Sequence, residues 1–536
     1  MPAEDAAAPH AWTVIEQMRN ALILLLSAVA YALCFPPAAL SALALVAVVP
    51  LIAVATGETP GRAALWGYLW AVAMAVGITD WLPPAISLYY EQPLWLGIVI
   101  FLGATAVMVA VHYAVFAAYC SYVFRRYPRA WPFLAAAAWV VAELARSRLL
   151  TGNPWGLFGA TQIAVGVDGY DGYGAFALRL VQIAEVGGIY AVSFLLCLIN
   201  AVVVQSWHDG RLRRSGERGQ GGPAMIATVA LVAAALGYGH LRVATYSSAI
   251  ANATRVSVVQ ANLDLGYRWE RAHYGRNLDA YLALTRQALD ANDPALVVWP
   301  ENAMTFFLDT RGDYRMTIAQ VTEPAGVELL AGGPRYEEGA ERTDYFNSAF
   351  VLSAEGEVTG VYDKEHLLPF AEYFPFGSIE LLRRSFVSDE GSVSQITPGV
   401  QVAALQTVAG RAGVAICNEI MFPDVVGRRV ADGADFLLNL ANDGWMRSDE
   451  FAEHQLVLAI ARAIEQRRYL VRASTSGPSA FVDPAGRIVS RTGAYEATVL
   501  NGEISPSTAR TVYARVGDLF ALCCLLVVVA TALRRR

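Results

Sequence analysis

Long apolar runs are the feature that most constrains what this chain of 536 residues can fold into. A helix needs about 20 apolar residues to cross a bilayer, and somewhat fewer where neighbouring helices bury it. The runs lie near residues 20–35, 38–55, 63–82, 94–123, 131–145, 187–206, 224–241 and 518–533. The pattern therefore predicts a multi-span α-helical membrane bundle of about eight helices.

The composition supports a chain that lies partly in lipid, since 55% of the residues are hydrophobic and 16% are charged. The formal charge of −7 is spread along the chain without a basic stripe, so we expect no nucleic-acid partner. Six cysteines, mostly in apolar runs, do not form a disulfide framework. No CxxC pair and no histidine cluster has metal-ligand spacing, so neither a metal nor another cofactor is indicated.

Arginines between the apolar runs orient the bundle. With a cytoplasmic N-terminus, the inner segments are 56–62, 124–130, 207–223 and the C-terminal tail, and each contains arginine. The outer loops 36–37 and 83–93 contain neither lysine nor arginine, as the positive-inside rule requires. The same count places residues 246–512 on the outer face. Segment 146–186 is an outer exception that carries arginines, and we expect a structured lid or docking surface there.

The first apolar run has two interpretations. Residues 21–33 could be the apolar part of a cleaved signal peptide. However, only Arg19 supplies positive charge ahead of the run, and a second apolar run follows Pro36 and Pro37. We therefore expect a retained helical hairpin.

Residues 246–512 have a different pattern, in which short β-rich runs alternate with helical stretches. This alternation predicts an extramembrane α+β layered domain with its own core. We expect strands at 255–260, 295–299, 327–331, 348–352, 358–362, 414–416, 436–439, 470–473, 479–482 and 498–504, and helices at 270–291, 312–324 and 450–467. The predicted divisions are thus a bundle at 1–245, an outer domain at 246–512, and a final helix with a basic tail at 513–536.

Three reactive side chains in this domain each follow a strand-like run: Glu301 in Val-Val-Trp-Pro-Glu, Lys364 in Val-Tyr-Asp-Lys and Cys417 in Val-Ala-Ile-Cys. A carboxylate against an apolar wall can act as a general base. A lysine can donate to an oxyanion and lower the pKa of a thiol. Alone, each residue could be an ordinary helix cap, surface lysine or packing cysteine. Together they favour an acyl-transfer site with Cys417 as nucleophile.

These three motifs, in this order, resemble the Glu-Lys-Cys triad of the nitrilase superfamily. The helical half narrows the resemblance to the apolipoprotein N-acyltransferase family, and the match covers nearly the whole chain. The matching segments are 139–146, 150–155, 258–262 with Trp269, 364–376, 438–445 and 462–465.

The resemblance implies a nitrilase-like αββα sandwich on the periplasmic face of a bacterial cytoplasmic (inner) membrane. It implies transfer of an acyl chain from a phospholipid, phosphatidylethanolamine in particular, through a Cys417 thioester to the α-amine of a diacylglyceryl-cysteine lipoprotein. Glu301 would be the base, and Lys364 would stabilise the oxyanion together with a backbone N–H near Cys417. Glu372 and Glu419 match acids that support the site. We expect a monomer.

The resemblance also assigns substrate contacts. Trp269 matches an aromatic residue on a mobile arm, and Trp155 and Trp445 lie in matching motifs. Phe370 and Phe374 belong to an aromatic stretch after Lys364. That stretch either lines an acyl-chain groove, dips into the membrane, or forms an ordinary packed loop.

One residue departs from the family, because Asn418 follows the nucleophile where tyrosine is usual. Asparagine keeps a hydrogen-bonding amide beside the oxyanion but loses an aromatic wall. Two alternatives therefore stay open, a membrane-anchored amidase and an N-acyltransferase for a different amine. A transporter or scaffold with an inactive domain is disfavoured because Glu301, Lys364 and Cys417 are all present.

Overall fold

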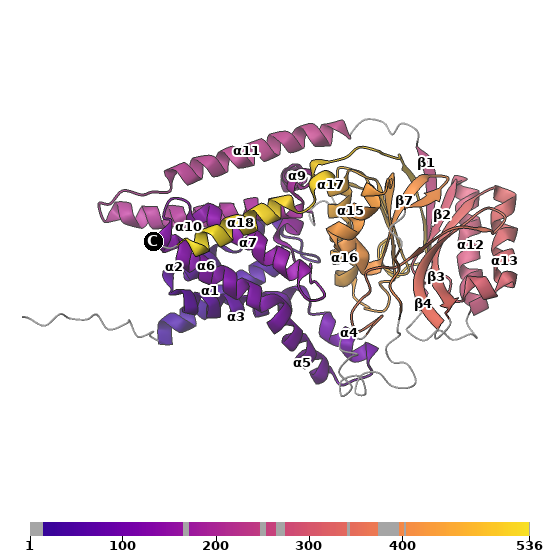
Figure 1. The fold of residues 1–536 in the computed structure, drawn as a ribbon, viewed down its shortest axis with the longest axis horizontal. Coiled ribbons are helices and arrows are strands. Elements are labelled where there is room, and N and C mark those ends of the chain that lie inside the picture. The colour runs from indigo at the N-terminus through magenta and orange to yellow at the C-terminus, as the bar shows by residue number, and fades with distance from the viewer. Residues whose placement is uncertain are drawn as a thin grey trace, which may run out of the picture.

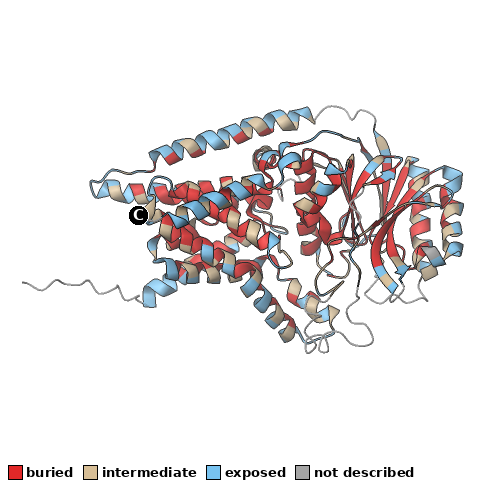
Figure 2. Ribbon diagram, viewed as in Figure 1, coloured by how far each residue is buried: buried red, intermediate tan, exposed pale blue. Residues whose placement is uncertain are grey.

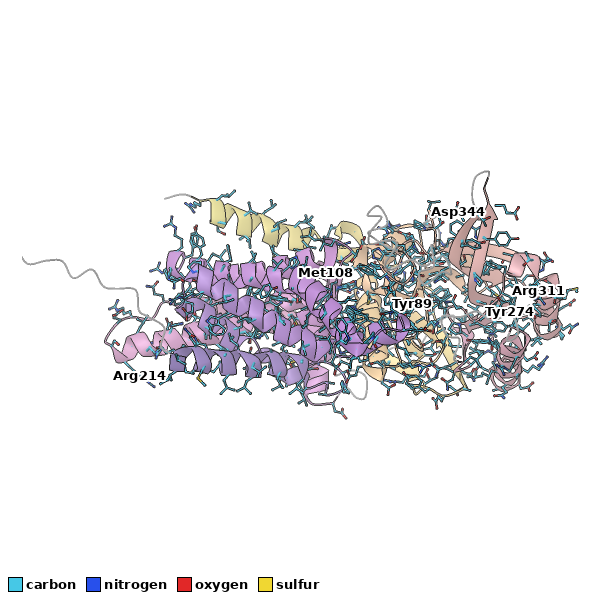
Figure 3. The ribbon with its side chains drawn as sticks, turned by 90° about the horizontal axis from the view of Figure 1, so that it is seen from below. Tyr89, Met108, Arg214, Tyr274, Arg311 and Asp344 are labelled. Atoms are coloured by element: carbon cyan, nitrogen blue, oxygen red, sulfur yellow. The ribbon has the colours of Figure 1, made fainter. Side chains whose placement is uncertain are left out.

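The fold is taken from a computed structural model, which describes residues 14–163, 171–246, 253–263, 274–339, 343–373, 396–400 and 404–534. A helical bundle and an α/β sandwich lie end to end along the long axis of the molecule (Figure 1). The bundle is built from the first half of the chain and the C-terminal helix. In Figure 3, Tyr89 of the bundle lies near the junction with the sandwich, and Arg311 lies at the end of the sandwich that is farthest from the bundle.

The bundle contains eight apolar segments among the described residues. Five are long and apolar enough to cross a membrane: Val14–Ala32, Pro60–Ile78, Leu94–Arg126, Ile189–Arg214 and Gly222–Thr245. Two are shorter, Ser41–Gly57 and Leu519–Leu533. The remaining segment, α7 (Trp131–Arg148), carries three charged residues near its end. The predicted bundle of about eight helices is confirmed.

Prolines explain where helices depart from the predicted spans. The run at 38–55 is divided into a 3-10 helix, Ser41–Leu45, and α2 (Val49–Gly57), which begins with proline in its first turn. The expected outer loop 83–93 contains a short helix, α4 (Leu82–Tyr89), which also has proline in its first turn. Proline lacks the N–H that a helix interior needs but is tolerated at a helix start, so these prolines begin helices instead of ending them.

The sandwich consists of two six-stranded sheets. The first has the order β12-β1-β2-β3-β4-β5 and the second β11-β10-β9-β8-β7-β6. The strands are β1 Thr254–Gln260, β2 Leu296–Trp299, β3 Glu328–Glu338, β4 Thr343–Leu352, β5 Val358–Asp363, β6 Leu405–Thr407, β7 Gly410–Ile416, β8 Phe436–Ala441, β9 Leu470–Ser474, β10 Ala480–Val482, β11 Ile488–Arg491 and β12 Thr498–Ile504. Every predicted strand is present, whereas β6 and β11 were not predicted.

Helices cover both outer faces and give the predicted αββα layering. α12 (Tyr274–Asn292) and α13 (Gly312–Thr322) cover the first sheet, while α15 (Pro423–Ala431) and α16 (Asp449–Gln466) lie between the second sheet and the bundle (Figure 1). The two sheets enclose a core of fully buried aliphatic residues, including Val256, Val298, Ile416, Leu438 and Val471. The fold class predicted from the sequence is confirmed.

Helix α16 joins the two halves. Fifteen of its eighteen residues are buried, so it is covered both by the second sheet and by the bundle (Figure 2). Its Glu465 accepts a hydrogen bond from the backbone N–H of Ile189, at 2.8 Å, and a ring nitrogen of His454 lies 3.2 Å from the Pro36 carbonyl oxygen. One hydrophobic cluster runs from the bundle through α16. The sandwich is therefore packed directly onto the bundle.

Part of segment 146–186 also contacts the sandwich. Gln182, just after α8 (Tyr173–Val181), donates to the carbonyl of Ala485 at 2.9 Å. Glu185, in α9 (Ala184–Gly187), forms a salt bridge with Arg467. These contacts fit the expectation of a docking surface.

Candidate active site

The three predicted side chains meet where strands of the two sheets end. Glu301 follows β2 after Pro300, Lys364 directly follows β5, and Cys417 directly follows β7. Their exposed fractions are 5%, 1% and 4%, so water is largely excluded. The ammonium of Lys364 lies 3.9 Å from Oε1 of Glu301, and the Cys417 thiol lies close enough to both groups for their charges to shift its pKa. The structure thus brings all three residues together.

Cys417 stands at a sharp turn from strand to helix. It is the first residue of a 3-10 helix, Cys417–Met421, and its φ of +53° is left-handed, which is uncommon for a residue other than glycine. Asn439 supports the turn by donating to the carbonyls of Ala415, at 3.0 Å, and Cys417, at 3.4 Å. Such a turn lifts a nucleophile above the end of its sheet, where its side chain can meet a substrate.

Glu372 and Asn347 hold the acid and the lysine in place. Glu372 lies 2.8 Å from the Lys364 ammonium and accepts the backbone N–H of Leu368 at 2.7 Å. The Asn347 amide donates to both Glu301, at 2.8 Å, and Glu372, at 3.0 Å. Sequence reasoning missed Asn347. The available signal was a lone amide side chain in the buried part of strand β4.

The buried setting determines the resting protonation states. Burial raises the pKa of Glu301 to about 7, opposed by the Lys364 charge and reinforced by Glu372. Burial alone would lower the pKa of Lys364, but the negative charges of Glu372, Cys417 and Glu301 raise it overall. Burial and Glu301 raise the pKa of the Cys417 thiol more than Lys364 lowers it. The expected lowering of the thiol pKa by lysine is thus outweighed, and the resting thiol is protonated.

This arrangement supplies what an uncharged thiol needs to attack an ester. Glu301 can accept the proton when the carbon–sulfur bond forms, because its pKa lies near neutrality. Its Oε2 is buried without a hydrogen-bond partner among the described residues, so it remains open to a proton donor. The Lys364 ammonium stays charged and can stabilise an oxyanion.

Glu419 connects the ends of the lysine and cysteine strands. Its carboxylate accepts the backbone N–H groups of Glu365 and His366, each at 2.9 Å, and that of Ile416 at 2.8 Å. It also accepts the Tyr362 hydroxyl at 2.8 Å. Glu419, which is fully buried, therefore fixes the relative position of Lys364 and Cys417.

A polar network under Cys417 was not singled out from the sequence. Arg472, in β9, donates to Asp443 at 2.6 Å and to Gln455 at 3.1 Å. The Gln455 amide nitrogen in turn lies 3.9 Å from the Cys417 sulfur. A buried arginine inside a strand was the available signal, because such a charge needs buried partners.

Asn418, the departure from the family, is buried with 3% exposure. Its side-chain oxygen has no hydrogen-bond partner among the described residues. An amide in this state beside the nucleophile is available to a ligand.

Those predicted substrate residues that the structure describes lie at the junction with the bundle. The Trp155 ring packs on Trp81 at 5.3 Å and on Phe451 at 5.4 Å. Phe370 is 41% exposed, and its carbonyl accepts the Tyr90 hydroxyl at 2.5 Å. Trp269 and Phe374, also predicted to bind substrate, lie outside the described residues.

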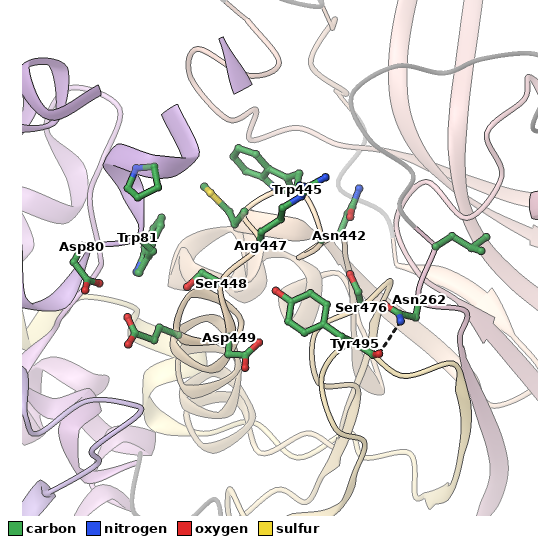
Figure 4. Close-up of a pocket in the computed structure, with 15 residues that line it drawn as sticks. Asp80, Trp81, Asn262, Asn442, Trp445, Arg447, Ser448, Asp449, Ser476 and Tyr495 are labelled. Carbon is green, nitrogen blue, oxygen red and sulfur yellow. Dashed lines mark hydrogen bonds between the residues drawn. The ribbon is translucent and has the colours of Figure 1, made fainter. Parts of the chain in front are cut away.

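A cavity of about 930 Å³ opens beside these residues, between the bundle and the sandwich (Figure 4). Trp445, another predicted substrate residue, lines it and lies 5.9 Å from the Tyr89 ring. The other lining residues are Asp80, Trp81, Pro84, Asn262, Leu263, Asn442, Gly444, Met446, Arg447, Ser448, Asp449, Glu450, Ser476 and Tyr495. Within the described ranges, no group of three or more histidine, cysteine or acidic residues is placed to hold a metal ion.

Comparisons with known proteins cover both halves. Residues 255–514 match the carbon-nitrogen hydrolase family, and residues 27–202 match the apolipoprotein N-acyltransferase N-terminal domain. The apolipoprotein N-acyltransferase of Geobacter metallireducens is 31% identical over 97% of this chain and 96% of its own length. That of Azotobacter vinelandii is 30% identical over 85% and 84%. Among solved structures, the NitN amidase of Nesterenkonia sp. AN1 aligns with a TM-score of 0.37 and 19% identity, over 50% of this chain and 98% of the amidase.

Proposed function

Because this chain belongs to the apolipoprotein N-acyltransferase family, we propose that it transfers an acyl chain from a phospholipid to the α-amine of a diacylglyceryl-cysteine lipoprotein. The reaction runs through a thioester on Cys417. The observation that carries the proposal is the buried grouping of Glu301, Lys364 and Cys417 beside a junction with apolar helices.

The first step moves the acyl chain to the enzyme. Cys417 Sγ attacks the ester carbonyl of the phospholipid while Glu301 takes the thiol proton. Lys364 stabilises the resulting oxyanion, together with a backbone N–H at the start of the 3-10 helix. When the carbon–oxygen bond breaks, Glu301 returns the proton to the leaving alkoxide. The products are a Cys417 thioester and a lysophospholipid.

The second step passes the chain to the acceptor. The neutral α-amine attacks the thioester carbonyl, and Glu301 takes one of its protons. The tetrahedral intermediate collapses with cleavage of the carbon–sulfur bond, and Glu301 returns the proton to the Cys417 sulfur. A dry site favours the amine over water in this step, because a thioester open to water would be hydrolysed.

The membrane position completes the proposal. We assign residues 1–245 to the bundle, 246–512 to a catalytic domain on the periplasmic face of the cytoplasmic membrane, and 513–536 to the final helix and its basic tail. Support comes from the arginines of the inner segments and from α16, which packs the sandwich onto the apolar helices. We take phosphatidylethanolamine as the donor and the monomer as the active form.

Mass spectrometry of the purified protein after incubation with phosphatidylethanolamine tests the first step. We expect an added acyl group on Cys417 that is absent in Cys417→Ala. No thioester under conditions that support transfer would refute the mechanism. A diacylated lipopeptide added next should yield triacylated product, whereas release of free fatty acid would instead indicate a hydrolase.

A further inference from the structure

The Cys417 sulfur meets a side-chain amide that comes from the helix joining the two halves. Gln455, on α16, is fully buried, and its amide nitrogen lies 3.9 Å from the Cys417 sulfur. A neutral thiol is a weak acceptor, so this contact contributes little in the resting state. A thiolate is a charged acceptor, and hydrogen bonds to charged groups are shorter and about twice as strong. The contact therefore gains strength whenever the sulfur carries charge.

The orientation of this amide is determined by its other end. The oxygen and nitrogen of a glutamine side chain are told apart by the hydrogen bonds that each makes. Arg472 donates to the Gln455 oxygen at 3.1 Å, and an arginine has donors but no acceptor. The amide nitrogen would be repelled in that position. The N–H side of the amide therefore faces the Cys417 sulfur.

Arg472 is itself held in one place. Its guanidinium donates to Asp443 at 2.6 Å, to the carbonyl of Pro478 at 3.2 Å and to the Asn439 side chain. Arg472, Asn439 and Asp443 are each exposed by 2% or less. A shift of any of them would leave a buried charge or polar group without its partner, which is unfavourable. The amide that faces the sulfur thus belongs to a fixed network.

The position of Gln455 also depends on the membrane bundle. Successive residues of a helix point about 100° apart, so His454 and Gln455 leave α16 in different directions. A ring nitrogen of His454 lies 3.2 Å from the carbonyl oxygen of Pro36 in the bundle, whereas Gln455 contacts Cys417 in the sandwich. The helix that attaches the sandwich to the bundle therefore also brings an amide to the nucleophile.

The proposed reaction places negative charge on this sulfur twice. Burial and the charge of Glu301 raise the pKa of the Cys417 thiol, yet the thiol must give up its proton when the sulfur attacks. The electron pair of the carbon–sulfur bond later returns to the sulfur when the thioester is cleaved. A charge in so dry a site is unfavourable unless a donor meets it. Lys364 cannot meet this need alone, because it also stabilises the oxyanion of the acyl group.

We propose, on the basis of the function proposed above, that Gln455 is the hydrogen-bond donor to the Cys417 sulfur in both steps. In acylation, the sulfur–hydrogen bond breaks, the proton goes to Glu301, and the Gln455 N–H bonds the thiolate without giving up its own proton. In transfer to the acceptor, the carbon–sulfur bond breaks with its electron pair on the sulfur. The same N–H bonds this thiolate until Glu301 returns the proton.

Gln455→Met removes the donor and keeps a side chain of similar volume. Thioester formation from phosphatidylethanolamine should become about three- to tenfold slower. The size follows from the loss of a hydrogen bond to a charged sulfur, about half of which is offset because a less stabilised thiolate is more nucleophilic. Mass spectrometry of the acylated protein over time measures the rate. A wild-type rate in Gln455→Met would overturn the proposal.

Gln455→Glu separates a sulfur donor from an amide that only supports Arg472. An ionised carboxyl pairs with Arg472 more strongly than an amide does, but it turns an acceptor toward the sulfur. The charged groups around it are Arg472, Asp443 and those of the Cys417 site. Acylation at about pH 8 should be at least about tenfold slower than in the wild type. The deficit should shrink at about pH 5, because a protonated carboxyl can donate.

The control for this change is Gln466→Glu, which alters a buried amide at the far end of α16 and should keep the wild-type pH profile. A wild-type rate of Gln455→Glu at about pH 8 would overturn the proposal. A loss that is the same at every pH in both Gln455 variants would also overturn it, because it would assign Gln455 a structural role. If Gln455→Met does not fold, Gln455→Glu decides.

Alkylation of Cys417 by iodoacetamide tests the donor without any acyl substrate. The full-length protein is labelled in detergent at about pH 8, and mass spectrometry of the Cys417 peptide measures the rate. The wild type should react fastest, Gln455→Met about three- to tenfold more slowly, and Gln455→Glu slowest. This order in a wild type that forms no thioester would support the donor and refute the proposed function. Equal alkylation rates in all three proteins would overturn the donor alone.

Discussion

The two sheets of the sandwich contribute different parts of the site and have different surroundings. The first sheet supplies Glu301 and Lys364, and its covering helix α12 buries only a stripe, formed by Leu278, Tyr281, Leu282, Thr285 and Ala288. The second sheet supplies Cys417, and its covering helix α16 is buried at fifteen of eighteen positions. The sheet that bears the nucleophile is thus fixed to the membrane bundle. The sheet that handles protons is held mainly through the core between the sheets.

The two sheets therefore have different tasks: the first positions the proton-transfer residues, and the second attaches the nucleophile to the bundle. Glu301 and Lys364 are positioned by neighbours from the first half of the sandwich, chiefly Asn347 and Glu372. Cys417 is positioned by Asn439 and by the network that includes Gln455 on α16. Changes in the first sheet should therefore alter rates, whereas changes in α16 should alter stability as well.

The largest expected effect comes from the nucleophile. Cys417→Ala should lower the transfer rate by at least about 10⁴-fold, since no thioester can form. Product formation followed by mass spectrometry measures this. Cys523→Ala, which changes an exposed cysteine in the C-terminal helix, is the control and should keep full activity. Residual transfer above about 1% in Cys417→Ala would show that another group carries the acyl chain.

Glu301→Gln tests the proton-handling sheet. It should lower the rate of thioester formation by about 10³-fold, because an amide still accepts the Asn347 hydrogen bond but cannot take a proton. Single-turnover kinetics with phosphatidylethanolamine measures the rate. Glu323→Gln, at an exposed site, should match the wild type. If Cys417 is acylated at the wild-type rate in Glu301→Gln, Glu301 is not the general base.

A matched pair of substitutions contrasts the covering helices directly. Ala459→Glu, on α16, buries a charge and should lower the free energy of unfolding by about 3 kcal/mol or more. Ala283→Glu, on the exposed side of α12, should change it by less than about 0.5 kcal/mol. Thermal unfolding in detergent measures both. Equal shifts would contradict the difference described between the two helices.

The pH dependence of acylation should follow Glu301. The base must be ionised, and its pKa is raised to about 7, so the rate should rise with pH and level off above neutrality. Between about pH 6 and about pH 8 the increase should be close to tenfold. The Cys417 and Lys364 pKa values are both raised and keep these groups protonated throughout this range. An acylation rate that falls as the pH rises would contradict the assignment of Glu301 as the general base.

Among the substitutions expected to slow the reaction, the smallest effect is expected at Glu372, which supports the lysine. Glu372→Gln keeps an oxygen near Lys364 but removes a charge, and should lower the acylation rate by about tenfold. Asp290→Asn, an exposed carboxylate on α12, is the control and should keep the wild-type rate. A Glu372→Gln variant that loses all activity would indicate a direct chemical role for Glu372.

The elements that the sequence predicted well are those whose signal is local. Strand β12 begins and ends where predicted because its β-rich run is bounded by turn residues. Glu301, Lys364 and Cys417 stood out because each follows such a run directly. Helix α4 lies within the loop predicted at 83–93 between two apolar runs, and its prolines occupy its first turn, where the missing N–H has no consequence.

The residues that the sequence did not reveal act through space. Asn347 bridges Glu301 and Glu372 only because β4 pairs on one side with β3, next to the strand that Glu301 follows. On its other side β4 pairs with β5, which leads into the loop that bears Glu372. Arg472, in β9, donates to Asp443, which follows the neighbouring strand β8, and to Gln455, which lies on α16. The direction of the Cys417 pKa shift also could not be predicted from a local pattern. Burial raises this pKa more than the charge of Lys364 lowers it, and the depth of burial depends on the whole fold.

The left-handed backbone at Cys417 limits which nucleophiles this architecture can use. Serine has the same unbranched Cβ and would fit the turn with no added clash. Threonine is branched at Cβ, and branched residues are strongly disfavoured at positive φ. The backbone at this position can therefore accept serine, a primary alcohol, in place of cysteine. It excludes threonine, a secondary alcohol, on steric grounds alone, whatever its reactivity.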